Sequence, residues 1–267
     1  LGIMCEFKRK NGYMFIKLQQ DLVIGENDEF EVNVLNCLTP DIKGVIVDID
    51  NTKYIDSSGL SILLRIRKLL FDKAKNLYIV VNNPKLIKVF KTARMDKDLI
   101  IVKNIEEIFD ESFIEKDENF ENPEIMEFKV VIPADFSYIK VVQDFVMRIV
   151  KNNYDYTKTD EYDILMSLEE TLSNSIEHGY EDSNKNAKIR ILVLSIHCEI
   201  IIFIDDYGKG YNSEKILEKV NNSFENPYNT RGRGFLILKG ITDDFHYDSM
   251  KDKVSSVIIV KKLNNKE

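Results

Sequence analysis

The sequence contains few of the residues that build metal centres and covalent cross-links. Among its 267 residues are three cysteines, three histidines and no tryptophan. Cys5, Cys37 and Cys198 lie far apart, and none of them belongs to a Cys-x-x-Cys pair. Neither a disulfide framework nor a zinc site is indicated, and the low cysteine content favours a reducing cytoplasm. The three histidines likewise disfavour a histidine-rich metal centre.

The sequence also lacks long apolar runs and an excess of basic residues. Runs such as Ile200–Ile204 are far shorter than the roughly 20 residues that cross a bilayer. We find no charged segment followed by an apolar one, which is the pattern of a secretory signal, so secretion is not indicated. The 37 Lys and Arg against 45 Asp and Glu give a net charge of −8, whereas proteins that coat nucleic acid or anionic membranes are normally basic. We therefore expect a cytoplasmic protein with no direct nucleic-acid or membrane partner.

The chain does contain two segments of different pattern, joined by an acidic stretch. Residues 1–113 carry 17 basic and 17 acidic side chains. Residues 114–125 carry one lysine against five acids and include Pro123, and residues 126–267 hold 19 basic and 23 acidic side chains. We expect residues 114–125 to be a linker between two domains. The alternative is a helix end that runs into a solvated loop within one domain.

The two segments differ in the order of their predicted elements. In residues 1–113 strands alternate with helices, which indicates an α/β fold. In residues 126–267 helices accompany paired strands, which indicates an α+β sandwich with helices on one face of a mostly antiparallel sheet. The predicted strands are Tyr13–Leu18, Gly44–Ile49, Asn76–Val81, Leu99–Val102, Phe128–Ile132, Lys188–Ile196, Glu199–Ile204, Phe245–Asp248 and Ser255–Val260. The predicted helices are Leu60–Phe71, Leu86–Ala93, Ile105–Phe109, Tyr138–Val150, Asp160–Glu177 and Phe235–Ile241.

The motif Asp56-Ser57-Ser58-Gly59 lies between a predicted strand and a predicted helix. A side-chain oxygen there can accept hydrogen bonds from the free N–H groups of the first helical turn, so a helix N-cap alone would explain the motif. The other interpretation is a phosphorylation switch. A phosphate at this turn would add roughly −1.5 to −2 charges beside Asp56 and could expel an acidic partner.

The run VIVDIDNTKYIDSSGLSILL, Val45–Leu64, resembles the STAS domain of anti-sigma-factor antagonists, and the resemblance extends over about residues 5–112. The D-S-S-G-L motif is fairly specific when it follows an apolar strand in this way. The resemblance implies an α/β STAS fold for residues 1–113. It also implies that Ser58, the second hydroxyl residue of the motif, is the phospho-acceptor, with Ser57 as the second choice.

In the predicted helix Asp160–Glu177, two sets of side chains recur every fourth residue. The apolar set is Ile164, Leu168, Leu172 and Ile176, and the polar set is Glu170, Asn174 and His178. The two sets are offset by two positions, which is about 200° around a helix, so they lie on roughly opposite faces. Taken alone, the polar set would be an ordinary solvated face.

Two glycine-containing turns argue for more than a solvated face. The strand Ile200–Ile204 runs directly into Asp205–Gly210 (DDYGKG), a sequence that lets the backbone approach a ligand closely. Arg231–Gly234 (RGRG) precedes the helical run Phe235–Leu238. Free N–H groups, a helix dipole and guanidinium donors at such a turn suit a polyphosphate. Each turn is a weak signal alone, but their order and spacing together are much less common.

Together these motifs resemble the GHKL ATPase fold over about residues 127–263, with the N box at Glu170–His178, the G1 box at Asp206–Gly210 and the G2 box at Gly232–Gly234. The run SLEETLSNSIEHGYED, Ser167–Asp182, is most similar to the anti-sigma-factor serine kinases. The resemblance implies that residues 126–267 form a GHKL (Bergerat) ATP-binding sandwich and that the cofactors are ATP and Mg²⁺.

The same resemblance implies a role for each matching residue. Glu170 would be the general base for the substrate serine, Asn174 would bind Mg²⁺, and Asp206 would accept a hydrogen bond from the adenine amino group. The other nucleotide-binding positions would be His178, Gly208, Gly210, Gly232, Gly234 and Ser255. Arg231 and Arg233 are both candidates for contact with the terminal phosphate. Where the family usually has Gly-Thr, this sequence has Val254-Ser255.

These resemblances predict a serine protein kinase of a partner-switching pathway, with a sigma factor or a STAS-domain protein as its partner. The serine would be its own Ser58, reached in cis or within a dimer, or a serine of a partner chain. A 12-residue tether spans roughly 20 Å, so its effective concentration would be on the order of millimolar. The alternative is a non-catalytic interaction module, in which ATP is a structural ligand and the domains sequester a sigma factor or a STAS partner.

Overall fold

The computed structural model describes residues 5–23, 27–109, 125–179, 187–196, 198–208, 233–250 and 254–266. The chain divides into two compact units, Leu1–Pro123 and Glu124–Glu267. The expected linker, residues 114–125, lies outside the described residues except for Ile125. None of the helices in the described ranges is long and apolar enough to cross a membrane.

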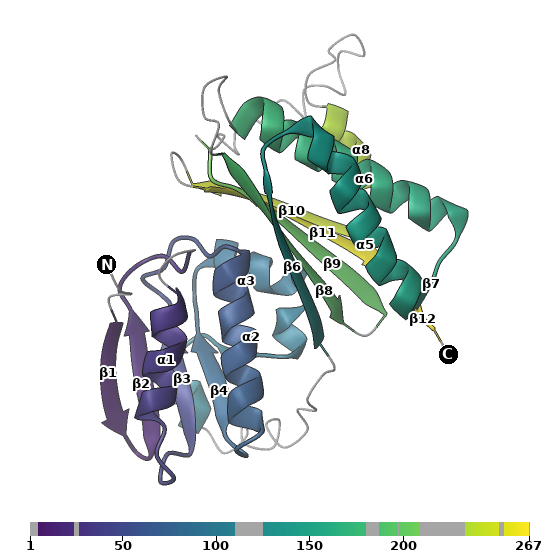
Figure 1. The fold of residues 1–267 in the computed structure, drawn as a ribbon. Coiled ribbons are helices and arrows are strands. Elements are labelled where there is room, and N and C mark those ends of the chain that lie inside the picture. Colours follow the sequence, from purple (N-terminus) through teal and green to yellow (C-terminus); the bar gives the residue numbers. More distant parts are fainter. Residues whose placement is uncertain are drawn as a thin grey trace. The chain divides into compact units, whose positions relative to one another are not determined.

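The first unit is built on a five-stranded sheet with the strand order β1-β2-β3-β4-β5 (Figure 1). Its strands are β1 (Cys5–Lys10), β2 (Tyr13–Leu18), β3 (Gly44–Asp48), β4 (Asn76–Val80) and β5 (Ile100–Val102). β1 pairs antiparallel with β2, and the other neighbours are parallel. The sequence pattern does not predict β1, because its residues CEFKRK are largely charged, as edge strands often are.

Helices and short turns connect these strands. The helices are α1 (Asn27–Cys37), α2 (Ser57–Phe71) and α3 (Pro84–Thr92), and the 3₁₀ turns are η1 (Met95–Lys97) and η2 (Glu106–Phe109). α1 packs against α2, which also contacts β4. The sequence pattern misses α1, whose buried Phe30 and Val34 are too few to produce a helical periodicity. The helix predicted at Ile105–Phe109 is the 3₁₀ turn η2.

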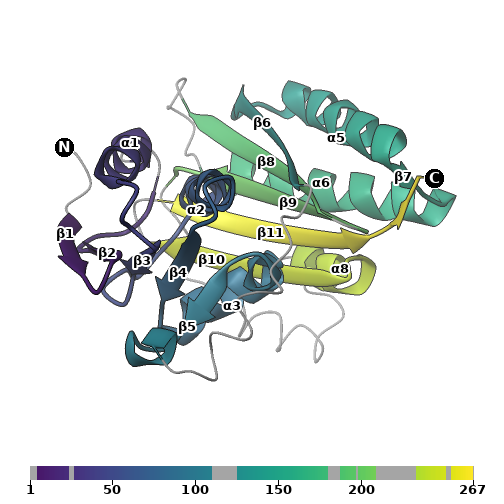
Figure 2. The same cartoon turned by 90° about the horizontal axis from the view of Figure 1, so that it is seen from below.

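The second unit is a five-stranded antiparallel sheet in the order β10-β11-β9-β8-β6, with helices on one face (Figures 1 and 2). Its strands are β6 (Ile125–Pro133), β8 (Lys188–Ile196), β9 (Glu199–Asp206), β10 (Asp244–Met250) and β11 (Val254–Lys262). The helical elements are η3 (Phe136–Tyr138), α5 (Ile139–Asn153), α6 (Lys158–Gly179) and α8 (Arg233–Ile241), and β7 (Tyr154–Asp155) pairs with β12 (Asn264–Asn265).

The core of the second unit lies between this sheet and the helices. The four apolar positions predicted along α6 are all buried in it. They pack with alternate residues of the strands, among them Ile189, Ile191, Ile202, Ile204, Val257 and Ile259. Because side chains alternate between the faces of a strand, every second residue of β9 and β11 faces the helices. The predicted α/β fold of the first unit and the α+β sandwich of the second are both confirmed.

Candidate functional site

The Asp56–Gly59 turn is a helix N-cap whose carboxylate also binds a serine hydroxyl. Asp56 Oδ1 accepts hydrogen bonds from Ser58 N at 2.9 Å and from Gly59 N at 3.0 Å. The same oxygen accepts from Ser58 Oγ at 2.5 Å. Asp56 is fully buried, and Ser57 and Ser58 are 1% and 8% exposed. The N-cap interpretation is therefore correct, and the hydroxyl of Ser58 is held by the capping group.

Gly59 is required by the close approach of the chain to the start of α2. A Cβ atom at this position would lie 2.5 Å from the carbonyl oxygen of Leu22 and 2.7 Å from Cγ1 of Ile55. Leu22 and Ile55 are themselves joined as a parallel bridge. Backbone lies on one side of Gly59, so no side chain fits without displacing it. This contact fixes where α2 begins and where Ser58 lies.

In the second unit, Glu170 and Asn174 of the polar set of α6 face α8 rather than open solvent. A Cβ atom at Gly234 would lie 2.6 Å from Glu170 Oε2 and 3.2 Å from Asn174 Nδ2. Gly234 is the second residue of α8, so the free N–H groups of that helix begin beside a carboxylate and an amide. The structure thus joins two motifs that are about 60 residues apart in the sequence.

Several predicted site residues cannot be located. Arg231, Gly232 and Gly210 lie outside the described residues, and so does the segment 211–230. His178 and Arg233 belong to described helices, but their side chains are not described.

Asp206 ends β9 on the face that carries the core, and it is 3% exposed. Burial raises the pKa of Asp206 to about 6, although hydrogen bonds from Gly208 N and from the Ser175 side chain partly oppose that shift. The bond from Gly208 N to Asp206 Oδ1 is 3.3 Å long. Asp206 is therefore a buried hydrogen-bond acceptor that is mostly ionised at pH 7.

A group of hydroxyls surrounds Asp206. Ser255 on β11 is its direct cross-strand partner, and Ser255 Oγ lies 3.2 Å from Ser249 Oγ on β10. Burial raises the pKa of Tyr247 to about 12, with the carboxylate of Asp206 adding to the shift. Ser175, Ser249 and Tyr247 are not predicted from the sequence. Strand alternation is the signal that could have found the last two, because both share the face of β10 that lies beside Ser255.

The arrangement suits a ligand with a polar ring at one end and an anion at the other. Near Asp206 and Ser255 the site offers a buried carboxylate and hydroxyls, which can pair with an amino group. Near Gly234 it offers a helix N-terminus with space that a Cβ atom would fill, which can hold phosphate. The described residues contain no group of three or more His, Cys, Asp or Glu able to hold a metal ion. Mg²⁺ is usually held by one or two protein oxygens, with phosphate oxygens and waters as its other ligands.

Comparison with known proteins agrees with this division of the chain. A model of the STAS domain matches residues 5–108, and a model of the histidine kinase-like ATPase domain matches residues 132–261. The anti-sigma F factor of Clostridium acetobutylicum is 31% identical over 110 residues, which are 41% of this chain and 75% of that protein. The anti-sigma F factor of Clostridium perfringens is 33% identical over 112 residues, which are 41% of this chain and 78% of that protein.

Among solved structures, the anti-sigma factor antagonist SpoIIAA in its unphosphorylated form covers 43% of this chain and 99% of its own length, with 15% identity and a TM-score of 0.34. The ATPase domain implies that the chain binds ATP. With a STAS domain at residues 5–108 and an ATPase domain of the anti-sigma factor kinase type at residues 132–261, the chain belongs to the anti-sigma factor family.

Proposed function

We propose that the chain is an ATP-dependent serine protein kinase of a partner-switching pathway. Its substrate is a serine of a STAS domain, either its own Ser58 or the equivalent serine of a partner, and its partners are a sigma factor or a STAS-domain protein. The observation that carries the proposal is the approach of Gly234 to Glu170 and Asn174. Phosphoryl transfer to a hydroxyl uses groups that hold the phosphates and a carboxylate that takes the hydroxyl proton, and this approach would bring the two together.

Each residue of the proposed site has a chemical task. ATP supplies the γ-phosphoryl group: the serine oxygen forms a new bond to phosphorus, the bond from phosphorus to the β–γ bridging oxygen breaks, and ADP leaves. Glu170 accepts the proton of the serine hydroxyl. Asn174 offers an amide oxygen to Mg²⁺, and N–H groups near Gly234 neutralise phosphate charge. Asp206 and Ser255 bind the adenine ring of ATP.

The remaining predicted positions complete this proposal. We propose that Gly208 and Gly210 shape the adenine pocket and that Gly232 and Gly234 bind around the phosphates. Arg231 and Arg233 are the candidates for contact with the terminal phosphate. His178, the last residue of the N box, is a further nucleotide-binding position.

The acceptor hydroxyl is constrained by its own domain. Ser58 Oγ donates to Asp56 Oδ1, and Ser58 is only 8% exposed. A phosphate on Ser58 cannot keep this hydrogen bond, because the oxygen loses its proton and gains negative charge beside a carboxylate. We therefore propose that the Asp56–Gly59 turn opens before transfer and that phosphorylation keeps it altered.

The test is incorporation of radiolabel from γ-labelled ATP with Mg²⁺, followed by mass spectrometry of the acceptor. We expect label on Ser58, loss of label in Glu170→Gln, and loss in Ser58→Ala with retention in Ser57→Ala. A mixture of Glu170→Gln protein with Ser58→Ala protein separates transfer within one chain from transfer between chains. The kinase proposal would be refuted if the wild-type chain labelled neither itself nor an added STAS protein.

A second candidate is a non-catalytic ATP-binding module that sequesters a sigma factor or a STAS partner. The burial of both serines favours it, since a buried hydroxyl is a poor acceptor. It predicts that ATP binds without being consumed. It also predicts that partner binding is the same in the wild-type chain and in Glu170→Gln.

A further inference from the structure

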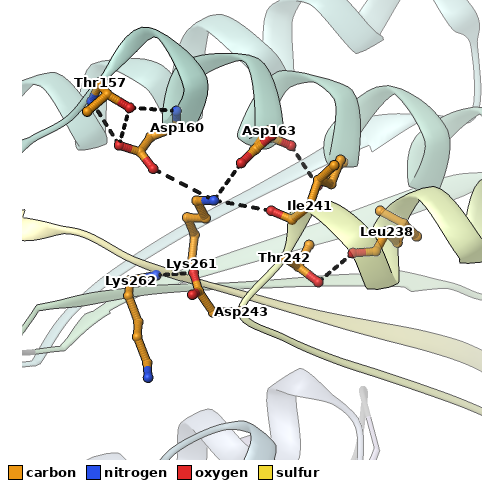
Figure 3. Close-up of polar contacts among 10 residues, drawn as sticks. Thr157, Asp160, Asp163, Leu238, Ile241, Thr242, Asp243, Lys261 and Lys262 are labelled. Carbon is orange, nitrogen blue, oxygen red and sulfur yellow. Dashed lines mark hydrogen bonds and ion pairs between the residues drawn. The ribbon is translucent and has the colours of Figure 1, made fainter.

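Lys261 joins the beginning of α6 to the end of α8 (Figure 3). Its Nζ donates to Asp163 Oδ2 at 2.6 Å and to the carbonyl oxygen of Ile241 at 3.2 Å, and it lies 3.7 Å from Asp160 Oδ1. The Lys261 and Asp163 side chains are only 13% and 12% exposed. This lysine is therefore a largely buried link between two helices, carried by a third element, β11.

The charges of this cluster match the helix ends that they contact. Asp160 and Asp163 lie in the first two turns of α6, where the helix dipole favours negative charge. Lys261 binds the carbonyl of the last residue of α8, where the dipole favours positive charge. Burial opposes the charge on Lys261, but its hydrogen bond to Asp163 and the nearby carboxylates of Asp163, Asp243 and Asp160 outweigh burial and raise its pKa.

The turn after α8 is held to the same strand. Thr242 Oγ1 donates to the carbonyl oxygen of Leu238 at 2.6 Å, and Asp243 Oδ2 accepts from Lys262 N at 2.8 Å. Asp243 N donates to the carbonyl oxygen of Val260 at 3.0 Å. The turn after α8 is thus attached to β11 by two hydrogen bonds of Asp243, next to Lys261 in the strand.

α8 lies antiparallel along α6, with one contact near each end. Its second residue, Gly234, meets Glu170, and its last residue, Ile241, is linked through Lys261 to Asp163. Gly234 to Ile241 and Asp163 to Glu170 are both seven residues, which is roughly 10 Å of helix in each case. A shift of α8 along α6 at the Lys261 end would therefore displace Gly234 from Glu170 by the same amount.

We propose that Lys261 is a positioning residue, which sets the register of α8 against α6. It thereby holds the N-terminal end of α8, at Gly234, in place to bind the phosphates of a nucleoside triphosphate. This inference rests on the proposed function, because it assumes that ATP binds at that end of α8. Lys261 does not touch the nucleotide. It acts on the phosphates through α8 and leaves the group around Asp206 and Ser255 unaffected.

The experiment compares Lys261→Met with Lys261→Arg and with the neighbouring Lys262→Met, in the full-length chain. Lys262 is exposed and its backbone N–H donates to Asp243, a bond that a change of side chain keeps, so it is a matched control. Dissociation constants for Mg-ATP and for adenosine are measured by isothermal titration calorimetry. We expect Lys261→Met to weaken the binding of Mg-ATP by at least about tenfold and the binding of adenosine by less than about twofold. Lys261→Arg should restore most of the affinity for ATP, and Lys262→Met should bind like the wild type.

Equal ATP affinity in Lys261→Met and wild type would overturn the inference, and so would a parallel loss of ATP and adenosine, which would indicate a purely structural role. Removal of the lysine leaves Asp163 buried without its cation, and the single variant can fail to fold for that reason. The double variant Lys261→Met, Asp163→Asn removes both charges and should show the same selective loss of ATP.

The binding measurement also separates the two proposals. If Lys261→Met selectively loses ATP binding but the wild-type chain transfers no phosphate, the kinase proposal is refuted and the role of Lys261 is supported. If the wild-type chain transfers phosphate and Lys261→Met does so equally well at limiting ATP, the kinase proposal is supported and the role of Lys261 is refuted. A wild-type chain that binds no ATP would overturn both.

Discussion

Gly234 approaches Glu170 so closely that a single added methyl group would lie 2.6 Å from the Glu170 carboxylate oxygen. The glycine belongs to the start of α8 and the glutamate to the middle of α6. The backbone N–H groups of one helix and the carboxylate of another therefore share a space that only glycine leaves open.

Gly234→Ala should remove ATP binding and phosphate transfer while leaving the fold intact. The methyl group must displace Glu170 or Asn174, but alanine is favoured over glycine in a helix by about 0.5–1 kcal/mol. We expect phosphate transfer to fall by about 100-fold or more, with little change in the free energy of unfolding. Gly240→Ala in the same helix is the control, since its Cβ atom would meet nothing within 4 Å. Equal activity of the two variants would show that Gly234 does not border the site.

Asp206→Asn should stabilise the ligand-free chain at neutral pH and weaken ATP binding. An acid whose pKa is raised by folding destabilises the native state as pH rises from its unfolded value, 3.8, to its folded value, about 6. Over that interval the native state holds more protons than the unfolded state, so stability falls with pH and then levels off. The full shift corresponds to about 3 kcal/mol.

Urea unfolding of the wild type and of Asp206→Asn at pH 4 and pH 7 measures this effect. The asparagine variant should gain stability relative to the wild type as the pH is raised, by an amount approaching about 3 kcal/mol. A difference that does not change with pH would mean that Asp206 does not titrate in this range.

Asp56→Ala should destabilise the first unit through the loss of a helix cap. Asp56 Oδ1 accepts two backbone hydrogen bonds and one from Ser58 Oγ. Removal of such a cap costs about 0.5–2 kcal/mol, and we expect the upper part of this range because Asp56 is fully buried. Asp56→Asn keeps an acceptor oxygen and should retain most of the stability. Thermal or urea unfolding of both variants is the measurement, and an equal loss in the two would argue against the capping role.

Gly59→Ala should destabilise the first unit by overpacking. The added Cβ atom would lie 2.5 Å from the backbone oxygen of Leu22, which cannot move away as a flexible side chain would. Overpacking of this kind costs about 1–3 kcal/mol. Comparison of the unfolding midpoint with that of Gly240→Ala, where space is open, separates the steric effect from the gain in helix propensity. A midpoint at or above the wild-type value would show that the backbone relaxes there.

Periodicity and local chemistry determined most of the elements of this protein. The strand Lys188–Ile196 begins and ends as predicted, and the apolar set of α6 is buried as predicted. These features depend on side-chain spacing within one segment, which the sequence displays directly. β1 and α1 escaped prediction because their stability comes from neighbours, namely the pairing with β2 and the packing against α2.

The motifs that carry the candidate site were also visible in the sequence, but their mutual distances were not. No local pattern indicates that Gly234 meets Glu170 or that Ser255 pairs with Asp206, because each contact joins segments about 50 to 65 residues apart. The link from Lys261 to Asp163 and Ile241 spans a still wider separation, 98 residues on its longer side.

The sequence by itself thus determined most of the elements of this protein, its two domains and the residue types available for chemistry. Only the tertiary structure decided which of those residues are in contact and which lysine links two helices. Local periodicity is a property of neighbouring residues, whereas close approach between helices follows from the packing of the whole core.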